Sequence, residues 1–321
     1  MCRSLFGVCE VGVAALGASP FHVTRDNGAH WQSFQLNLPN VPITDLKLHH
    51  DDLIVSTQGR AFWMIDNVTS LQQFTPQSTA GAVRLYQPRD GYRTRAAASY
   101  QPVIEYFLPA SATGAVTIDI LDAKGQAVNS YNSETPAPDP EAAGGSGGGR
   151  GRGGPPSRVT KTPGLNRFTW DVQHASGFGA PPGAYQVKLT ANGQTLTQPL
   201  TVLIDPRLAA EGVTAADLQE QFDHIVRMRE LVASLAQVAA RVRDALSKND
   251  PRAAPLAAKL FVDPPGVRYG KPGLQEQINY LAGMTRGVDQ KIGRDAIERY
   301  HVLKNALEDL RLEVDRVLGK L

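Results

Sequence analysis

The chain has 321 residues, with 33 lysines and arginines against 31 aspartates and glutamates. This balance excludes a strong overall attraction to nucleic acid or to an anionic membrane surface. Apolar residues make up 42% of the chain, and its length allows two or three domains, each with its own core. The only cysteines, Cys2 and Cys9, exclude a disulfide framework and form either one disulfide or two free thiols.

Residues 1–19 resemble a signal peptide without completing its pattern. Arg3 precedes an apolar run, but Glu10 interrupts that run where a signal peptide is uniformly apolar. We therefore interpret residues 1–19 as an irregular amino terminus that contains an incomplete strand. No stretch reaches the ~20 uninterrupted apolar residues that a membrane-spanning helix needs.

Short β-prone runs follow, separated by glycine, asparagine, aspartate and proline. Between residues 20 and 76 the runs are PFHVT, TDLKLHH, DLIVST and AFWMID. Between residues 83 and 205 they are VIEYFLP, AVTIDILD, NRFTWDV, AYQVKLT and QPLTVLID. Apolar and polar residues alternate in this second set, which predicts an antiparallel sandwich with one buried face on each sheet.

Residues 132–157 interrupt the predicted sandwich. This glycine- and proline-rich segment has almost no large apolar residue, so we expect a disordered insert. Arg150 and Arg152 raise the alternative of an RNA-binding element, but the segment has no aromatic residue to stack on a base. We therefore expect no nucleic-acid partner.

From residue 214 onward, apolar residues recur every three or four positions, which predicts α-helices. Thr214 is the predicted cap of the first helix, and KNDPRAAP is its predicted end. Gly287 and Gly293 mark the break between the second and third helices. Charges of both signs disfavour the alternative of a basic membrane-surface helix. We predict a bundle of three helices over residues 214–321.

One turn carries a recognisable motif, TRDNGAHW at residues 24–31. Its Asn-Gly pair is a strong hairpin signal, because glycine adopts a positive φ without penalty, and its aspartate can accept hydrogen bonds from turn amides. We expect the large tryptophan ring at the start of the next strand to be buried. The motif resembles the Asp-box, a structural turn of neuraminidase repeats and sortilin-type β-propellers, in four positions: Thr24, Asp26, Gly28 and Trp31.

Residues 36–74 resemble the closing blade of large secreted bacterial proteins, which are sortilin-like and often labelled glycosyl hydrolases. The first matching positions are Asp45, Leu46, His49, Asp52 and Leu53. The others form a blade-end motif: Thr57, Gly59, Arg60, Trp63 and Asp66. Gln58 stands where the family usually has histidine, and Asn67 where it has a second aspartate. Both departures weaken any argument that this loop is chemically active.

The resemblance continues through GLNRFTWDV, PPGAYQVKLT and TQPLTVLIDPR, which are similar to the immunoglobulin-like sandwich that follows the propeller in this family. That sandwich is itself similar to the one in flagellar-hook assembly proteins. The resemblance implies a mainly β fold with additional α structure. Its expected parts are one terminal β-propeller blade at 20–76, a β-sandwich at 83–205 and a three-helix bundle at 214–321.

The resemblance also implies a function. We expect the non-catalytic carboxy-terminal portion of an exported β-propeller protein, extracellular or periplasmic, that acts in interaction or assembly. A lone blade of ~40 residues cannot bury its sheet faces, so upstream blades or another protein chain are the expected partners of this fragment. A carbohydrate or peptide ligand belongs to the full-length protein. The alternative is the remnant of a sialidase-like glycoside hydrolase whose catalytic blades are absent from this chain.

No constellation of residues predicts catalysis, a metal or a cofactor. Glycosidases need two positioned carboxylates, whereas Asp119, Asp122 and the aspartates of HHDD (49–52) fit strand or turn positions. The two histidines of HHDD are adjacent in a strand, so they point to opposite faces and make a poor chelate. We expect Arg60 to make a structural hydrogen bond rather than to hold a substrate carboxylate.

Overall fold

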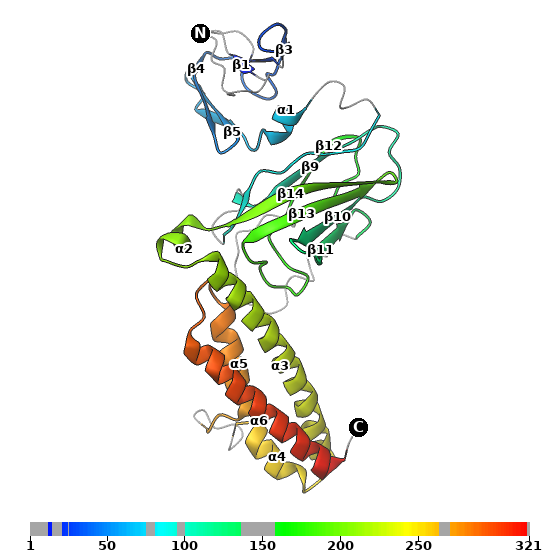
Figure 1. The fold of residues 1–321 in the computed structure, drawn as a ribbon, viewed down its shortest axis with the longest axis vertical. Helices are drawn as coiled ribbons and strands as arrows, with labels where there is room; N and C mark the ends of the chain where they lie inside the picture. Colours follow the sequence, from blue (N-terminus) through cyan, green and yellow to red (C-terminus); the bar gives the residue numbers. More distant parts are fainter. Residues whose placement is uncertain are drawn as a thin grey trace. The chain divides into compact units, whose positions relative to one another are not determined.

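The fold is mixed β and α, with several antiparallel sheets followed by helices (Figure 1). It is a computed structural model that describes the backbone of 12–14 and residues 21–24, 26–74, 81–94, 100–135, 158–262 and 270–319. The chain forms two compact units: Met1–Ala175 with Gly183–Leu203, and Ser176–Pro182 with Ile204–Leu321. Most of the predicted irregular amino terminus and most of the predicted insert lie outside the described residues.

Two three-stranded sheets lie in the amino-terminal region, where the sequence predicts one blade over residues 20–76. One sheet consists of β1 (Gly12–Ala14), β2 (His22–Thr24) and β3 (Trp31–Ser33). The other consists of β4 (Ile43–His49), β5 (Asp52–Thr57) and β6 (Phe62–Ile65). Pro39 and Pro42 lie between β3 and β4. Because proline has no N–H to donate to a ladder, this connection ends the first sheet before β4 begins.

A small apolar core joins these two sheets and the short helix α1 (Thr69–Gln73). Its fully buried members are Phe21, Val23, Leu53, Val55 and Val68. In β5, buried Leu53 and Val55 alternate with half-buried residues, so one face of the β4–β6 sheet is covered and the other faces outward. Each buried side chain contributes about 1.5–3 kcal/mol, whereas ordering the backbone costs about 1–2 kcal/mol for every residue. Because few side chains are buried and many residues are ordered, this core offsets only part of the entropy cost of the two sheets.

Two further antiparallel sheets complete the first unit. Their orders are β11-β10-β13-β14-β8 and β12-β9-β7. The strands are β7 (Arg84–Leu85), β8 (Gly91–Arg93), β9 (Val103–Leu108), β10 (Thr117–Asp122), β11 (Ala127–Asn132), β12 (Gly164–Thr169), β13 (Gly183–Ala191) and β14 (Gln194–Ile204). Ring centroids lie 4.7 Å apart for Tyr131 and Phe168, and 5.3 Å apart for Trp170 and Tyr185. These aromatic contacts pack one sheet against the other, as the alternating pattern predicts.

A hydrogen-bonded cluster fixes the chain just after the insert. The buried hydroxyl of Tyr106 in β9 donates to the Thr160 carbonyl at 2.5 Å and accepts from the Thr160 N–H at 3.0 Å. Asn166 of β12 accepts from the Thr160 hydroxyl at 2.6 Å. The ion pair of Lys161 with Glu134, at 2.5 Å, joins this segment to the first residues of the predicted insert, 132–135, which the structure describes. The two sides of the insert are therefore held at the sandwich.

The second unit contains five helices among the described residues: α2 (Pro206–Ala210), α3 (Ala215–Ser247), α4 (Ala253–Leu260), α5 (Leu274–Arg286) and α6 (Arg294–Leu318). Thr214 caps α3 as predicted. Its hydroxyl accepts from the Asp217 N–H at 3.1 Å, while the Asp217 carboxylate accepts from the Thr214 N–H at 2.9 Å. Gly287 follows α5 and Gly293 precedes α6, so the predicted break between helices lies where the sequence places it.

The core of the bundle contains one helix more than the predicted three. The segment KNDPRAAP was expected only to end the first helix, but α4 begins within it. The Asp250 carboxylate accepts from the Arg252 N–H at 3.0 Å, and a new helix starts at Ala253. Leu256 and Leu260, one turn apart, are buried in the core shared with α3, α5 and α6. A helix of eight residues is too short to be recognised from a repeating apolar pattern in the sequence.

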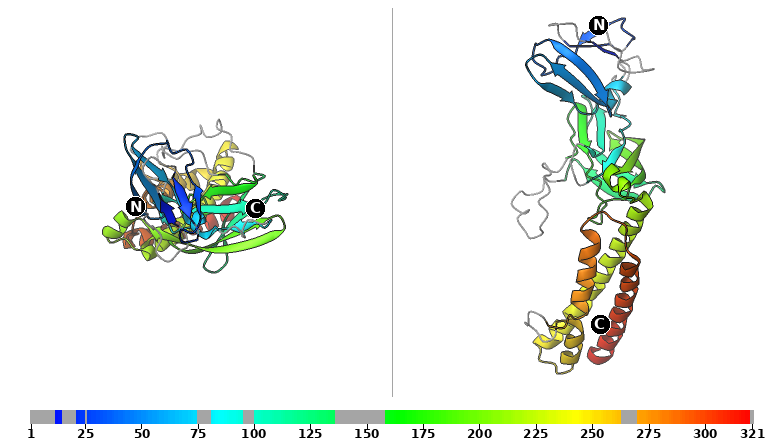
Figure 2. Two further views of the ribbon diagram at one scale, coloured as in Figure 1. Left: turned by 90° about the horizontal axis from the view of Figure 1, so that it is seen from above. Right: turned by 90° about the vertical axis from the view of Figure 1, so that its left-hand side faces the viewer.

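α3, α5 and α6 run alongside one another in Figure 1 and in the right-hand view of Figure 2, and they bury a common apolar core. In the part of the chain that the structure describes, no helix combines the length and apolar character that crossing a membrane requires.

Candidate interaction site in the amino-terminal sheets

The four Asp-box residues meet in the hairpin turn between β2 and β3, where Thr24 lies opposite Trp31. The Thr24 hydroxyl donates to Asp26 Oδ1 at 2.8 Å and accepts from the Gly28 N–H at 2.9 Å. Asp26 Oδ1 also accepts from the His30 N–H at 2.8 Å. Gly28 has a φ of 93°, which glycine adopts without strain. The side chains of this turn therefore satisfy its own main-chain groups.

The Asp26 carboxylate is committed to this turn. The His30 amide, the His30 side chain and the Thr24 hydroxyl all hydrogen-bond to it, and they lower the pKa of Asp26 to about 2. His30 Nδ1 lies 2.5 Å from Asp26 Oδ2. A carboxylate held ionised in this way stabilises the turn and does not act as a general acid at neutral pH.

Trp31 is less buried than the sequence predicts, because its side chain remains 36% exposed. A Cβ placed on Gly28 would lie 3.8 Å from the Trp31 ring, so the indole covers the glycine of its own turn. Phe21 and Phe34, whose centroids are 6.2 Å apart, lie in or against the core instead. The expectation of a buried Trp31 ring is therefore wrong.

Four residues of the blade-end motif form a second turn, between β5 and β6. The Thr57 hydroxyl donates to the Ala61 carbonyl at 2.7 Å, and the Trp63 indole N–H donates to the Arg60 carbonyl at 2.9 Å. Gly59 has a φ of 81°. The hydrogen bond expected at Arg60 thus uses its carbonyl, while its side chain is exposed. In the described part of the chain, no hydrogen bond or ion pair joins this turn to the Asp-box turn.

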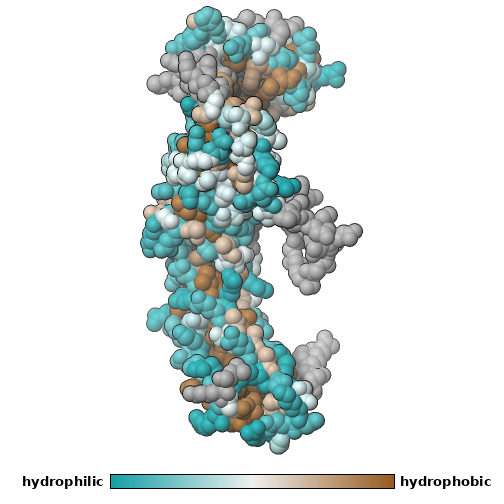
Figure 3. Space-filling model, turned by 90° about the vertical axis from the view of Figure 1, so that its right-hand side faces the viewer, coloured by the Kyte–Doolittle hydropathy of each residue, from teal (hydrophilic) through white to brown (hydrophobic). Residues whose placement is uncertain are grey.

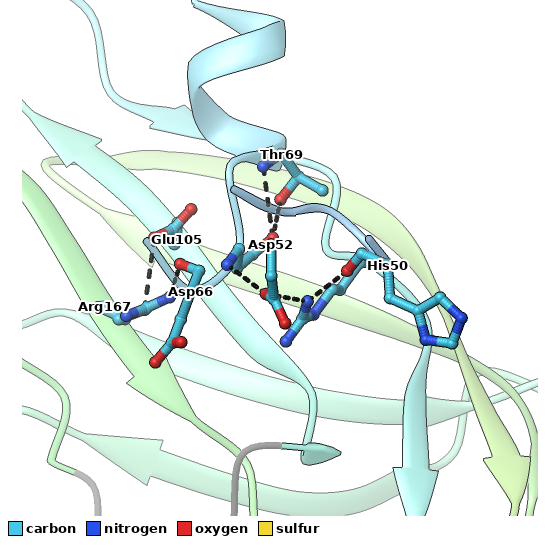
Figure 4. Close-up of polar contacts among 8 residues, drawn as sticks. His50, Asp52, Asp66, Thr69, Glu105 and Arg167 are labelled. Atoms are coloured by element: carbon cyan, nitrogen blue, oxygen red, sulfur yellow. Dashed lines mark hydrogen bonds and ion pairs between the residues drawn. The ribbon is translucent and has the colours of Figure 1, made fainter. Parts of the chain in front are cut away.

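The fifth motif residue, Asp66, contributes its carbonyl to a contact with the sandwich. Arg167 Nη2 of β12 donates to the Asp66 carbonyl at 2.7 Å, and Arg167 Nε lies 3.4 Å from Glu105 Oε1 (Figure 4). Burial raises the pKa of Glu105, and hydrogen bonding by Ser70 and the charge of Arg167 oppose that rise. Arg167 therefore ties β12 to the segment that follows β6.

A second arginine holds the HHDD turn. Arg89 Nη1 donates to Asp52 Oδ1 at 2.6 Å and to the His50 carbonyl at 2.5 Å. Asp52 Oδ1 also accepts from the Asn67 N–H at 2.8 Å. The His50 ring points away from the Asp52 carboxylate (Figure 4). These residues therefore make a structural junction, and the described residues contain no group of histidine, cysteine and carboxylate side chains suited to a metal ion.

Sequence reasoning missed the three residues that make this junction, Arg89, Glu105 and Arg167. Arg89 lies 37 positions from Asp52, and Arg167 lies 101 positions from Asp66. No local pattern reports such distant pairs. Glu105 did carry a signal, because it is the single charge in the apolar run VIEYFL and a buried charge needs a partner.

The outward face of the β4–β6 sheet carries exposed apolar side chains on β6. Phe62 and Met64 are 78% and 57% exposed. They lie opposite Ser56 and Ile54 of β5, on the face away from the core. Among the described strands of the two small sheets, Phe62 and Met64 are the most exposed large apolar residues. Figure 3 shows the molecule from the right-hand side of Figure 1, where other apolar residues, in brown, also reach the surface.

β6 is also an edge strand, at the end of the order β4-β5-β6. The Thr57 N–H donates to the Ala61 carbonyl at 3.2 Å. Because ladder bonds alternate along an antiparallel pair, the main-chain groups of Phe62 and Met64 then face away from β5. The strand contains neither a charge nor a proline, the usual protection of an edge. It therefore offers a partner strand both hydrogen-bonding groups and apolar side chains.

One hollow among the described residues of the two small sheets is too small for a sugar. It is lined by residues that include Phe21, Phe34, Trp63 and Met64, and it measures about 30 Å³. One water molecule occupies about that share of liquid volume. The outward face, and not this hollow, is the feature of these sheets that suits a macromolecular partner.

The carboxylates considered for glycosidase chemistry have structural partners. Asp119 accepts from the Ser130 hydroxyl at 2.7 Å and lies 3.0 Å from Lys188 Nζ. Asp122 accepts from the N–H groups of Lys124 and Gln126, each at 2.8 Å. They serve a strand face and a hairpin turn, as the sequence predicts.

Comparison with known proteins adds little. No family model and no curated protein matches the chain. Among solved structures, one similar chain is PorZ, a surface component of the type-IX secretion system of Porphyromonas gingivalis. The two sequences are 11% identical and the TM-score is 0.21; the match covers 61% of this chain and 22% of PorZ. Another is the extracellular domain of a hybrid two-component system from B. thetaiotaomicron, with 10% identity and a TM-score of 0.19. That match covers 63% of this chain and 25% of the other chain. The chain thus spans a quarter or less of each, and scores this low carry no argument about function.

Proposed function

We propose that this chain is the non-catalytic carboxy-terminal portion of an exported β-propeller protein and that it acts in protein interaction or assembly. Its partner is β-structure supplied by upstream blades or by another protein chain. The proposal rests chiefly on β6, which combines an uncharged open edge with the exposed side chains of Phe62 and Met64.

Two features of the amino-terminal sheets support this function. Their shared core is small, so covering the outward face of β4–β6 would add the apolar burial that the module lacks. Arg89 and Arg167 fasten the same module to the sandwich by main-chain and side-chain hydrogen bonds. A partner strand bound at β6 would therefore be linked to a firmly anchored platform.

The first test uses sedimentation velocity of the full chain over a range of concentrations. The exposed edge predicts that the chain associates with itself through β6, because a second copy offers the same strand. The double variant Phe62→Lys/Met64→Lys places charges on that strand and is expected to sediment as a monomer. Gln32→Lys adds a charge to exposed β3, in the other sheet, and serves as the matched control that keeps associating.

Hydrogen exchange supplies the second readout. The amides of Phe62 and Met64 are expected to exchange fast in dilute protein and slowly in the associated form. A chain that stays monomeric at all concentrations while these two amides exchange slowly would show that β6 is already covered, and the proposal would fail.

A further inference from the structure

The helical unit contains a buried histidine whose ring has no hydrogen-bond partner. His224 lies near the start of α3, and its exposure is 0%. Neither Nδ1 nor Nε2 has a partner among the described residues. Buried polar groups are nearly always paired, so an unpaired imidazole in a helix core calls for a physical explanation.

The polar residue one turn earlier shows the contrast. Gln221 Nε2 donates to the Thr285 carbonyl at 2.9 Å and to the Val288 carbonyl at 2.7 Å. Its Oε1 accepts from the Gln290 N–H at 3.3 Å. Gln221 therefore fastens the start of α3 to the end of α5 and the segment after it, whereas His224 makes no such bond.

The ring of His224 packs instead on α6. Its centroid lies 5.8 Å from that of Tyr300, with the rings inclined at 67°. His301 lies next along α6, its ring 5.3 Å from Tyr300. On α3 itself, the Arg227 guanidinium lies 5.7 Å from the same Tyr300 ring. The ring of Tyr300 therefore lies against His224, and the charge of Arg227 acts on it.

Among the described residues, the charged group that acts on His224 is the cation Arg227, while Glu220 and Asp223, the nearest carboxylates along α3, are exposed. Lys291, in the segment before α6, lies 3.2 Å from Asp217 on α3. Asp217 also belongs to the cap at Thr214, so its carboxylate is already engaged. Burial and the positive charge of Arg227 lower the pKa of His224 below 6.5.

We propose that protonation of His224 opens this end of the bundle, where the start of α3 meets the end of α5 and the start of α6, as the pH falls below neutrality. A protonated ring carries two donors that lack acceptors and a second positive charge near Arg227. Moving the ring into water relieves both, but it breaks the contact with Tyr300. The core from Met228 onward along α3 is apolar and stays packed.

The direction of the effect follows from linkage. The folded bundle favours the neutral ring, so the contribution of His224 is complete above its unfolded pKa, near 6.5. Stability then falls as the pH drops, by up to tenfold in the folding equilibrium constant per pH unit, until the pH reaches the lower folded pKa.

Hydrogen exchange of the full chain at pH 7.5 and pH 5.5 tests the proposal, with protection corrected for intrinsic exchange. In the wild type, protection near Gln221 and Tyr300 is expected to fall at least several-fold more than protection near Leu235 and Val242. His224→Phe fills the site with a ring that cannot ionise and is expected to remove this difference. His301→Phe, at an exposed position of α6, is the matched control and is expected to keep it.

A titration of the histidine ring resonances in the wild type does not depend on how the variants fold. His224 is expected to titrate below its ordinary pKa of 6.5, with slow exchange with solvent. The proposal is overturned if His224 titrates with an ordinary midpoint, or if a folded His224→Phe chain loses protection at pH 5.5 as the wild type does.

Discussion

Replacing Arg89 by alanine tests the junction between the amino-terminal sheets and the sandwich. The substitution removes the donors to Asp52 Oδ1 and to the His50 carbonyl, at 2.6 and 2.5 Å. Asp52 keeps the Asn67 N–H as a donor. The side chains of Arg89 and Asp52 are 13% and 24% exposed, so the carboxylate is left mostly buried without its counter-charge.

The contacts set the size of the effect. A hydrogen bond to a charged group contributes about 1.5–3 kcal/mol, and removing one partner of a buried ion pair costs about 3–5 kcal/mol. The remaining Asn67 donor and the partial exposure of Asp52 reduce the upper figure. We therefore expect Arg89→Ala to lower the free energy of unfolding by about 2–3 kcal/mol.

Urea unfolding of the full chain followed by tryptophan fluorescence measures this change. The three tryptophans of the chain are Trp31, Trp63 and Trp170, and they all lie in the first unit. Arg60→Ala, at an exposed position, is the matched control and should shift stability by less than about 0.5 kcal/mol. A double-mutant cycle with Asp52→Asn isolates the pair. Coupling near zero, or an Arg89→Ala chain as stable as the control, would refute the reasoning.

Three smaller predictions follow from local contacts. The carboxyl of Asp26 should titrate near pH 2 when followed by NMR. Because its pKa is lowered in the folded chain, its stabilising effect is present above pH 3.8 and is lost toward pH 2. Asp26→Asn should abolish this dependence of stability on acid pH. Burial raises the pKa of Glu105, so its ionisation destabilises the fold as the pH rises past 4.5, and Glu105→Gln should flatten the stability curve above pH 4.5. Thr214→Ala should cost about 1 kcal/mol by loss of the α3 cap, measured by thermal unfolding, with Thr214→Ser as the conservative variant that retains it.

Local patterns predicted much of the fold. Alternation in segments such as VIEYFLP and AYQVKLT indicated β9 and β13, and the cap at Thr214 marked the start of α3. The division of residues 20–76 into two sheets was not predicted, because a strand's propensity does not reveal the strand with which it pairs. α4 was missed because two turns are too short to show a helical period.

The same limit applies to the candidate site. The Asp-box turn was predictable because Thr24 and Trp31 are seven positions apart and their chemistry is local. The junction depends on pairs 37 and 101 positions apart, which no single sequence pattern encodes. The exposure of Phe62 and Met64 was equally hidden, because all four residues of β6, FWMI, are apolar and such a run does not show which of its two faces is covered.

The bond between Tyr106 and Thr160 has a practical consequence. Tyr106 holds Thr160 and Lys161 pairs with Glu134, so contacts fix the chain on both sides of residues 136–157, and the number of residues between them can change without altering these contacts. Doubling a flexible loop costs only about 0.6 kcal/mol in closure entropy. Residues 136–157 are therefore a natural position for an epitope tag, a fluorescent reporter or a whole guest domain.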